Sequence, residues 1–193
     1  DDTITAGAGI DTVNAGDGDD TIYGDAGADV INGGNGSDTA DYSNDDGNGG
    51  TAGITVDLAS GTQTVVDGYG DTDTLTDVEN VVGTDHDDIF TGETGVDNVF
   101  DAGSEDAGGD TLEYSTNGSN FVVDLDGETM TGDGAGTDTI IGFENVNTGA
   151  GNDTITGTAA KNVIDAGAGI NTINADDGDN TITATTGADV ITS

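Results

Sequence analysis

One aliphatic or aromatic residue recurs every nine positions along most of the chain, and small, acidic or amide residues fill the positions between. Residues 6–14 read AGAGIDTVN and residues 15–23 read AGDGDDTIY; units in the same phase follow at 24–41, 83–100 and 148–192. Small residues dominate the first four positions, Asp or Asn takes the sixth, and the apolar residue takes the eighth. These eighth positions are the predicted core, namely Ile4, Val13, Ile22, Ile31, Phe90, Val99, Ile155, Ile164, Ile173, Ile182 and Ile191, with Ala40 as a weak member.

Each unit predicts a glycine-rich turn followed by a strand of three residues. Glycine allows the positive φ that tight turns require, and alternate side chains of a strand point to opposite faces. Two units would make one coil with a strand on each side and the eighth-position residues inside. Coils stacked at about 4.8 Å would bury a thin core that no single coil can form. The pattern therefore predicts an all-β parallel β-roll or β-helix solenoid, without helices.

Two longer segments interrupt the units and resemble each other. Residues 38–82 contain DTADYS, ITVDLASG and TDTLTDVENVVG, and residues 110–149 contain DTLEYS, FVVDLDGE and TDTIIGFENVNTG. The alternation in ITVDL and FVVDL is typical of strands, and we expect Tyr42 and Tyr114 to pack against the next coil. We interpret the segments as wider coils of the same stack, with looped-out excursions near 44–53, 61–72, 103–109 and 127–137.

The chain then divides into five parts of one continuous solenoid. These are a nonapeptide array at 1–43, an interlude coil at 44–82, degenerate turns at 83–110, a second interlude coil at 111–147, and an array with Asn-substituted turns at 148–193. The sequence begins and ends inside repeats, so we expect it to belong to a longer array.

The charge and composition of the chain exclude several classes of partner and site. There are 40 acidic residues against one basic residue, and the formal net charge is −39. Such a surface argues against nucleic acid and anionic membranes as partners. The absence of Cys excludes disulfides and zinc–thiolate sites. His86 is the only His and lies in an acidic turn, while adjacent Asp pairs are repeat positions, so we expect no enzyme activity and no catalytic residue.

The nonapeptide resembles the RTX, or hemolysin-type calcium-binding, repeat GGxGxDxUx. The interludes are similar to those of large secreted bacterial proteins built from such repeats. The resemblance implies a β-roll with several Ca²⁺ ions between successive turns, bound by carbonyls at the second and fourth positions and by the sixth-position carboxylate. It also implies an extracellular or cell-surface location, with folding after export into calcium.

The implied ligands can be placed on this sequence. Calcium prefers roughly 6–8 oxygen ligands, and stacked carboxylates repel one another unless a cation lies between them. The candidate metal ligands are Gly7, Gly9, Asp11, Gly16, Gly18, Asp20, Asp25, Gly27, Asp29, Gly34, Gly36, Asp38, Asp88, Asp97, Gly149, Gly151 and Asp153. The turn with Glu105 and Asp106 cannot be assigned, and we expect the matched pairs Glu79–Asn80 and Glu144–Asn145 to cap turns or bind metal.

Three turns depart from the pattern at the sixth position. They carry Asn162, Asn171 and Asn180, which offer neutral amides. Stacked Asn side chains can form a hydrogen-bonded ladder without metal. We therefore expect ordered calcium at the Asp turns and little or none at the Asn turns.

Three functions remain open. The first is a calcium-binding structural segment of a secreted or cell-surface protein, such as an adhesin, a surface layer, or an extracellular filament or matrix component. The alternative is the calcium-binding C-terminal tail of a secreted protease or lipase. Ice binding is a distant third, because the outward Thr–Ile–Thr row of 3–5, 154–156 and 181–183 is broken by Tyr23, Asp41 and Asn174. Open strand edges predict end-to-end self-association.

Overall fold

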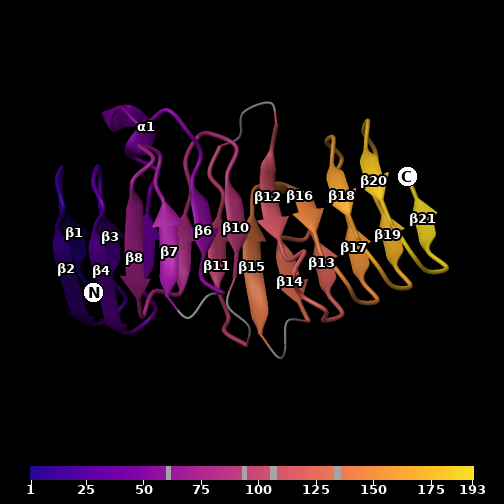
Figure 1. Ribbon diagram of the computed structural model, residues 1–193, viewed down its shortest axis with the longest axis horizontal. Coiled ribbons are helices and arrows are strands. Elements are labelled where there is room, and N and C mark those ends of the chain that lie inside the picture. The colour runs from indigo at the N-terminus through magenta and orange to yellow at the C-terminus, as the bar shows by residue number, and fades with distance from the viewer. Residues whose placement is uncertain (60–61, 93–94, 105–107, 133–135) are drawn as a thin grey trace.

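The computed structural model describes residues 1–59, 62–92, 95–104, 108–132 and 136–193. Within this part, the strands form two stacked sheets along one long axis (Figure 1). Sheet A contains, in spatial order, β1 (Thr3–Thr5), β3 (Thr21–Tyr23), β5 (Thr39–Asp41), β9 (Asn80–Val82), β11 (Val99–Asp101), β15 (Thr137–Ile141), β14 (Thr129–Thr131), β13 (Val122–Asp124), β17 (Thr154–Thr156), β19 (Thr172–Asn174) and β21 (Val190–Thr192). Sheet B contains β2 (Thr12–Asp17), β4 (Val30–Asn35), β8 (Thr72–Thr76), β7 (Gln63–Val66), β6 (Thr55–Asp57), β10 (Ile89–Thr91), β12 (Asp110–Glu113), β16 (Phe143–Asn147), β18 (Val163–Asp165) and β20 (Thr181–Thr183).

The repeat period sets the strand register in both arrays. Successive strands alternate between the sheets, and each pairs in parallel with the strand two places along the chain. The apolar residues come into line, with Ile4 opposite Ile22 and Ile155 opposite Ile173. Ile22 is fully buried, whereas the neighbouring Thr21 and Tyr23 face outward and are partly exposed. The predicted all-β fold and its eighth-position core are confirmed here.

One predicted core residue and one predicted ligand lie in the wrong register. Val99 is 41% exposed, and Phe100 is buried in its place. Phe100 pairs with Val81 of the core, which moves the sixth position from Asp97 to the buried Asn98. The turn before β11 holds one residue more than the repeat, and a shift of one residue exchanges the two faces of a strand. Ile191 is also half exposed, because β21 has a neighbour on one side only.

The interludes are three-stranded antiparallel insertions rather than wider coils. In the first, the chain passes two positions ahead to β6, turns back through β7, and reaches β8 beside β4. In the second, β13, β14 and β15 repeat the same path in sheet A. The expected loops at 61–72 and 127–137 therefore contain strands, because Val65 and Met130 each enter the core. Both sheets are mixed rather than wholly parallel.

The prediction of no helix is also wrong. Helix α1 (Asp45–Asn48) forms one turn inside the first excursion and ends at Gly49, whose φ is 114°. No helix in the described ranges is long and apolar enough to cross a membrane.

Aromatic residues widen the core in the middle of the molecule. Phe90 packs against Phe100 and Phe143, with ring centroids 5.3 and 5.2 Å apart. Tyr42 and Tyr114 are buried, as expected. The buried aromatic side chains therefore gather in the middle of the stack, where the interludes join it.

Candidate calcium sites

The second and fourth positions of the turns need glycine for two reasons. Their φ angles are positive, for example 113° at Gly16 and 122° at Gly18, a conformation that glycine adopts without steric cost. A side chain at Gly34 or Gly36 would also collide with the carbonyl oxygen of Gly16 or Gly18 in the preceding coil. The predicted carbonyl ligands therefore lie at the contact between stacked turns.

The same arrangement repeats along the arrays. A side chain at Gly27 would meet the Gly9 carbonyl oxygen, and one at Gly167 or Gly169 would meet that of Gly149 or Gly151. Asp25 takes the second position of its turn with a φ of 59°, in the left-handed region that Asp tolerates better than most residues. The turns thus stack in columns, with each of these glycines against a carbonyl oxygen of the preceding coil.

The sixth-position carboxylates form a second column beside the carbonyls. Oδ1 of Asp20 accepts the backbone N–H of Asp2 at 2.6 Å. Oδ1 of Asp38 accepts that of Asp20 at 2.8 Å, and Oδ1 of Asp29 accepts that of Asp11 at 2.8 Å. Each carboxylate thereby caps the turn of the coil below it and leaves its other oxygen for a different partner.

That second oxygen is the feature that points to a metal. Oδ2 of Asp20, Asp29 and Asp38 is buried without a hydrogen-bond partner, and the three residues are at most 1% exposed. Burial raises the pKa of Asp29, and the charges of Asp11 and Asp67 add to the shift. A buried, unsatisfied carboxylate is costly. An oxygen-seeking cation such as Ca²⁺ between the turns would remove this cost, so the residues present fit calcium.

The family comparison agrees with this geometry. The model of the RTX calcium-binding nonapeptide repeat matches residues 5–40, 133–173 and 174–193, with four copies. The chain belongs to the RTX calcium-binding nonapeptide repeat family. A search of curated proteins gave no match.

The Asn turns of this RTX chain satisfy themselves. The Nδ2 group of Asn171 donates to the Ala166 carbonyl at 3.1 Å. That of Asn180 donates to the Ala175 carbonyl at 3.1 Å. Their Oδ1 atoms accept backbone N–H groups of the preceding coil, as the Asp carboxylates do. For example, Asn180 Oδ1 accepts the Asn162 N–H at 2.9 Å. The amide hydrogens thus bind the carbonyls at the first position of their own turns, so these side chains have partners without a cation.

Other predicted ligands have protein partners already. Asp153 accepts the Phe121 N–H through Oδ1 and the Thr148 hydroxyl through Oδ2, at 2.8 and 2.7 Å. Asp88 accepts the Ile54 N–H at 2.6 Å and the Thr84 N–H at 2.8 Å. Asp97 is exposed and accepts the Thr137 N–H at 2.7 Å. Their roles as calcium ligands stay predictions. The carboxylate oxygens of Asp88 and Asp153 already accept hydrogen bonds, in contrast to Oδ2 of Asp20, Asp29 and Asp38.

Some members of the carboxylate column were missed from the sequence. Asp73, Asp110 and Asp138 lie inside or beside the interludes, are buried, and accept the backbone N–H of Asp29, Asp88 and Asn98, respectively. The signal was present, because each begins a tripeptide Asp–Thr–Leu or Asp–Thr–Ile that copies the end of a nonapeptide.

Two glutamates continue the column where a strand bulges or a turn is longer. Glu79 Oε2 accepts the Asp38 N–H at 2.9 Å, and Glu144 Oε2 accepts the Asp110 N–H at 3.1 Å. The expected capping role of these residues is confirmed. The register shift between β12 and β16 explains the longer side chain at Glu144.

Side chains alone do not complete a metal site. Within the described ranges, no group of three or more Asp, Glu, His or Cys side chains is arranged to hold an ion. The turn carbonyls must therefore supply much of the coordination. Glu105 and Asp106 lie outside the described residues.

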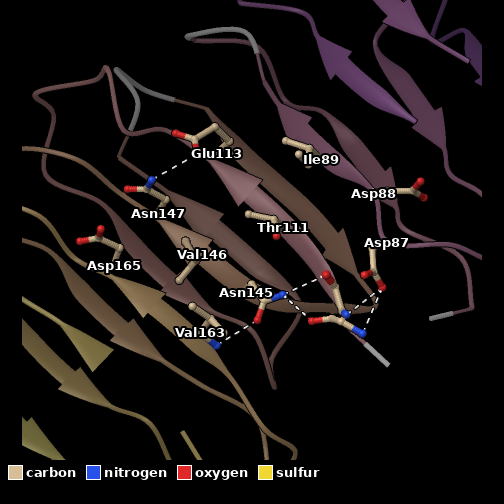
Figure 2. A pocket seen from close by; sticks show the side chains of 12 residues that line it. Asp87, Asp88, Ile89, Thr111, Glu113, Asn145, Val146, Asn147, Val163 and Asp165 are labelled. Atoms are coloured by element: carbon tan, nitrogen blue, oxygen red, sulfur yellow. Dashed lines mark hydrogen bonds between the residues drawn. The ribbon is translucent and has the colours of Figure 1, made fainter. Parts of the chain in front are cut away.

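A separate groove of about 480 Å³ lies on the outer face of sheet B (Figure 2). Glu113, Asn147 and Asp165 form one outward row across β12, β16 and β18, and Asn147 Nδ2 donates to Glu113 Oε2 at 3.2 Å. At one end the groove reaches Asp87, whose Oδ1 accepts the Gly109 N–H at 3.0 Å. Asn145 Nδ2 donates to the Gly109 carbonyl at 2.9 Å, and Asp165 Oδ1 accepts the Gly167 N–H at 3.0 Å, so much of the polar lining already has protein partners.

Proposed function

We propose that this chain is a non-catalytic structural segment of a secreted or cell-surface protein, which folds and stiffens as a β-roll on binding several Ca²⁺ ions. The observation that carries the proposal is the set of unpartnered, buried Oδ2 atoms of Asp20, Asp29 and Asp38 beside columns of turn carbonyls. Family membership supports calcium as the ion. In this role the turns bind the ions and the two sheets form the stiff body.

The turns at the N-terminal end would hold the ions. Carbonyls of Gly7, Gly9, Gly16 and Gly18 and carboxylates of Asp11, Asp20, Asp29 and Asp38 would supply the oxygens. Bound calcium provides the positive charge that the sequence lacks, because one basic residue stands against 40 acidic ones. Metal binding to such a site is coupled to folding, which suits export of an unfolded chain from a cytosol poor in calcium.

A calcium titration followed by circular dichroism tests this proposal. In chelator at low salt, charge repulsion should expand the chain, most of all at its Asp turns, and millimolar Ca²⁺ should give a full β-sheet spectrum. Magnesium is the matched control and should act poorly, because it demands tight octahedral coordination. A chain that is fully folded in chelator, with no response to calcium, would contradict the proposal.

The kind of parent protein is a further part of the proposal. We favour an adhesin, surface-layer or extracellular filament protein, because the described chain consists of stacked strands from one end to the other. The tail of a secreted protease or lipase is the alternative. The mass and activity of the full-length gene product distinguish the two, because an enzyme must carry a catalytic domain elsewhere.

Self-association completes the proposal. The outermost strands β1, β2, β20 and β21 each pair on one side only, and open edges are templates for another strand. We expect calcium to permit stacking along the long axis by neutralising the turns. Light scattering and electron microscopy with and without calcium would show it, and strictly monomeric particles in calcium would refute it.

A further inference from the structure

The first interlude adds acidic residues above the last regular turn of the N-terminal array. The hairpin turn between β7 and β8 spans Asp67 to Asp71 and stands where the next nonapeptide turn of that column would lie, because β8 pairs with β4. Helix α1 lies over this edge of the sheets (Figure 1). Its Asn48 donates to Asp25 at 3.2 Å, and its Asp45 accepts the Gly68 N–H at 3.0 Å. Turn, hairpin and helix therefore contact one another at this edge.

Four carboxylates are buried where the turn, the hairpin and the helix meet. Asp29, Asp45, Asp67 and Asp73 are each at most 2% exposed. Burial is the main cause that raises the pKa of all four, to about 7 for Asp45 and Asp73. The charge of Asp67 raises the pKa of Asp29, Asp45 and Asp73, which shows that the hairpin carboxylate acts on the other three.

Two oxygens within this group are buried and unpartnered. Asp67 Oδ1 accepts the N–H groups of Tyr69 and Asp71, but Asp67 Oδ2 has no partner. Asp29 Oδ2 has none either. A Cβ at Gly24 would lie 2.9 Å from Asp29 Oδ2 and 3.4 Å from Asp73 Oδ2. Glycine thus keeps open the space that Asp29 Oδ2 and Asp73 Oδ2 face, and the hairpin that carries Asp73 also carries Asp67.

We propose that Asp29 Oδ2 and Asp67 Oδ2 anchor a calcium site that joins the nonapeptide array to the first interlude beneath α1. Asp73 lies beside this space on β8, and its Oδ2 accepts the Tyr42 hydroxyl at 2.9 Å. Asp45 adds negative charge from the helix. This site rests on the proposed calcium function, because Asp29 also ends a nonapeptide turn, but its other residues come from the interlude.

The ion that fits is a hard divalent cation with flexible coordination. All donors are oxygens, and two direct carboxylates leave most ligand positions to backbone carbonyls or water, as Ca²⁺ permits and Mg²⁺ resists. The ion would offset the mutual repulsion of four buried acids. It would also fix the point where the chain leaves the regular repeat, so the interlude would be held in register by metal.

Calcium stoichiometry by equilibrium dialysis and metal analysis at neutral pH tests the site. Asp67→Asn keeps an oxygen acceptor for Tyr69 and Asp71 but removes the charge, and we expect it to bind one Ca²⁺ fewer than the wild type. Asp71→Asn is the matched control, because Asp71 is exposed in the same turn. The control should bind as many ions as the wild type.

A second pair of variants protects the test against a folding defect. Gly24→Ala fills the space between the carboxylates at a residue whose φ is not positive, and it should lose the same ion. Gly47→Ala in α1 meets no atom within 4 Å and should lose none. If the wild type binds calcium and both Asp67→Asn and Gly24→Ala keep its full stoichiometry and affinity, the site is refuted while the turn sites stand. A wild type that binds no calcium would overturn both.

Discussion

The two ends of the molecule use the same turn with different sixth residues. At the N-terminal end, Asp20, Asp29 and Asp38 each cap the preceding coil with Oδ1 and leave Oδ2 buried and unpartnered. At the C-terminal end, the equivalent amides of Asn171 and Asn180 donate to their own turn carbonyls. The change from oxygen to NH₂ therefore replaces an unpartnered oxygen with a hydrogen-bond donor that binds a carbonyl of the same turn.

This comparison separates two tasks of the sixth position. Capping of the neighbouring coil needs only one oxygen, which both Asp and Asn possess. Metal binding is favoured by a second oxygen and a negative charge, which only Asp has. We therefore expect the N-terminal array to depend on calcium for its stability, and the Asn turns to stack by hydrogen bonds without an ion.

The largest expected effect is a difference in amide hydrogen-exchange protection between the two ends of the molecule in chelator. Residues 1–41 should lose their protection against amide hydrogen exchange, because nothing offsets the buried carboxylates. Residues 157–183 should keep part of theirs, since the Asn turns need no ion. Exchange followed by mass spectrometry, with and without calcium, measures this directly. Equal loss of protection at both ends would break the comparison.

Conversion of an Asn turn into an Asp turn should give the next largest effect. Asn171→Asp places an unsatisfied carboxylate at a fully buried position and should lower the free energy of unfolding in chelator by about 1–3 kcal/mol. Calcium should restore much of the loss. Asn174→Asp is the control, because Asn174 is exposed on the outer face of β19. Chemical denaturation of both variants would decide, and an equal loss in the two would exclude the buried turn as the cause.

The reverse change should act in the opposite direction. Asp20→Asn gives the turn an amide that can donate to the Ala15 carbonyl, as Asn171 does to Ala166. We expect a gain of about 1 kcal/mol in chelator and weaker calcium affinity by titration calorimetry. Asp19→Asn, at the exposed neighbouring position, should change neither by much. Unchanged calcium affinity in Asp20→Asn would remove Asp20 from the ligands.

Much of this contrast can be predicted from the repeat alone. The period of nine places one apolar residue per strand inward, so the core positions Ile22, Ile31 and Ile164 follow from the sequence. The substitution of Asn for Asp also shows which turns lack a charge. These are local properties, and each coil repeats the surroundings of the last.

The antiparallel insertions could not be predicted in this way. Strand order depends on which segments pair over long sequence separations, and the interludes overshoot by two strands before they return. The segment before β11 has one residue more than the repeat. The regular spacing therefore predicted Val99 in the core and Asp97 at the sixth position, where the structure has Phe100 and Asn98. The hairpin carboxylate Asp67 raises the pKa of Asp29 only because β7 and β8 fold back beside β4, so no motif in the sequence joins the two residues.

The smallest expected effect is a pH dependence confined to the N-terminal half in chelator. Burial raises the pKa of Asp45 and Asp73 to about 7, and the groups that face them are Asp25, Asp29, Asp67 and Tyr42. Because the folded pKa lies above the unfolded value of 3.8, the folded state binds more protons. The stabilising effect is therefore fully present below the unfolded pKa and is lost as pH rises toward 7.

Protection of residues 1–41 in chelator should accordingly fall as the pH rises from about 4 to about 7, after correction for the intrinsic exchange rate. The Asn turns at 157–183 carry neutral amides at their sixth positions and should change little over the same range. Calcium should flatten the dependence, because it replaces the protons, and Asp45→Asn combined with Asp73→Asn should flatten it without metal. If the N-terminal array instead became more stable as pH rose in chelator, its carboxylates would be stabilised by partners in the protein, and the contrast between the two arrays would lose its electrostatic basis.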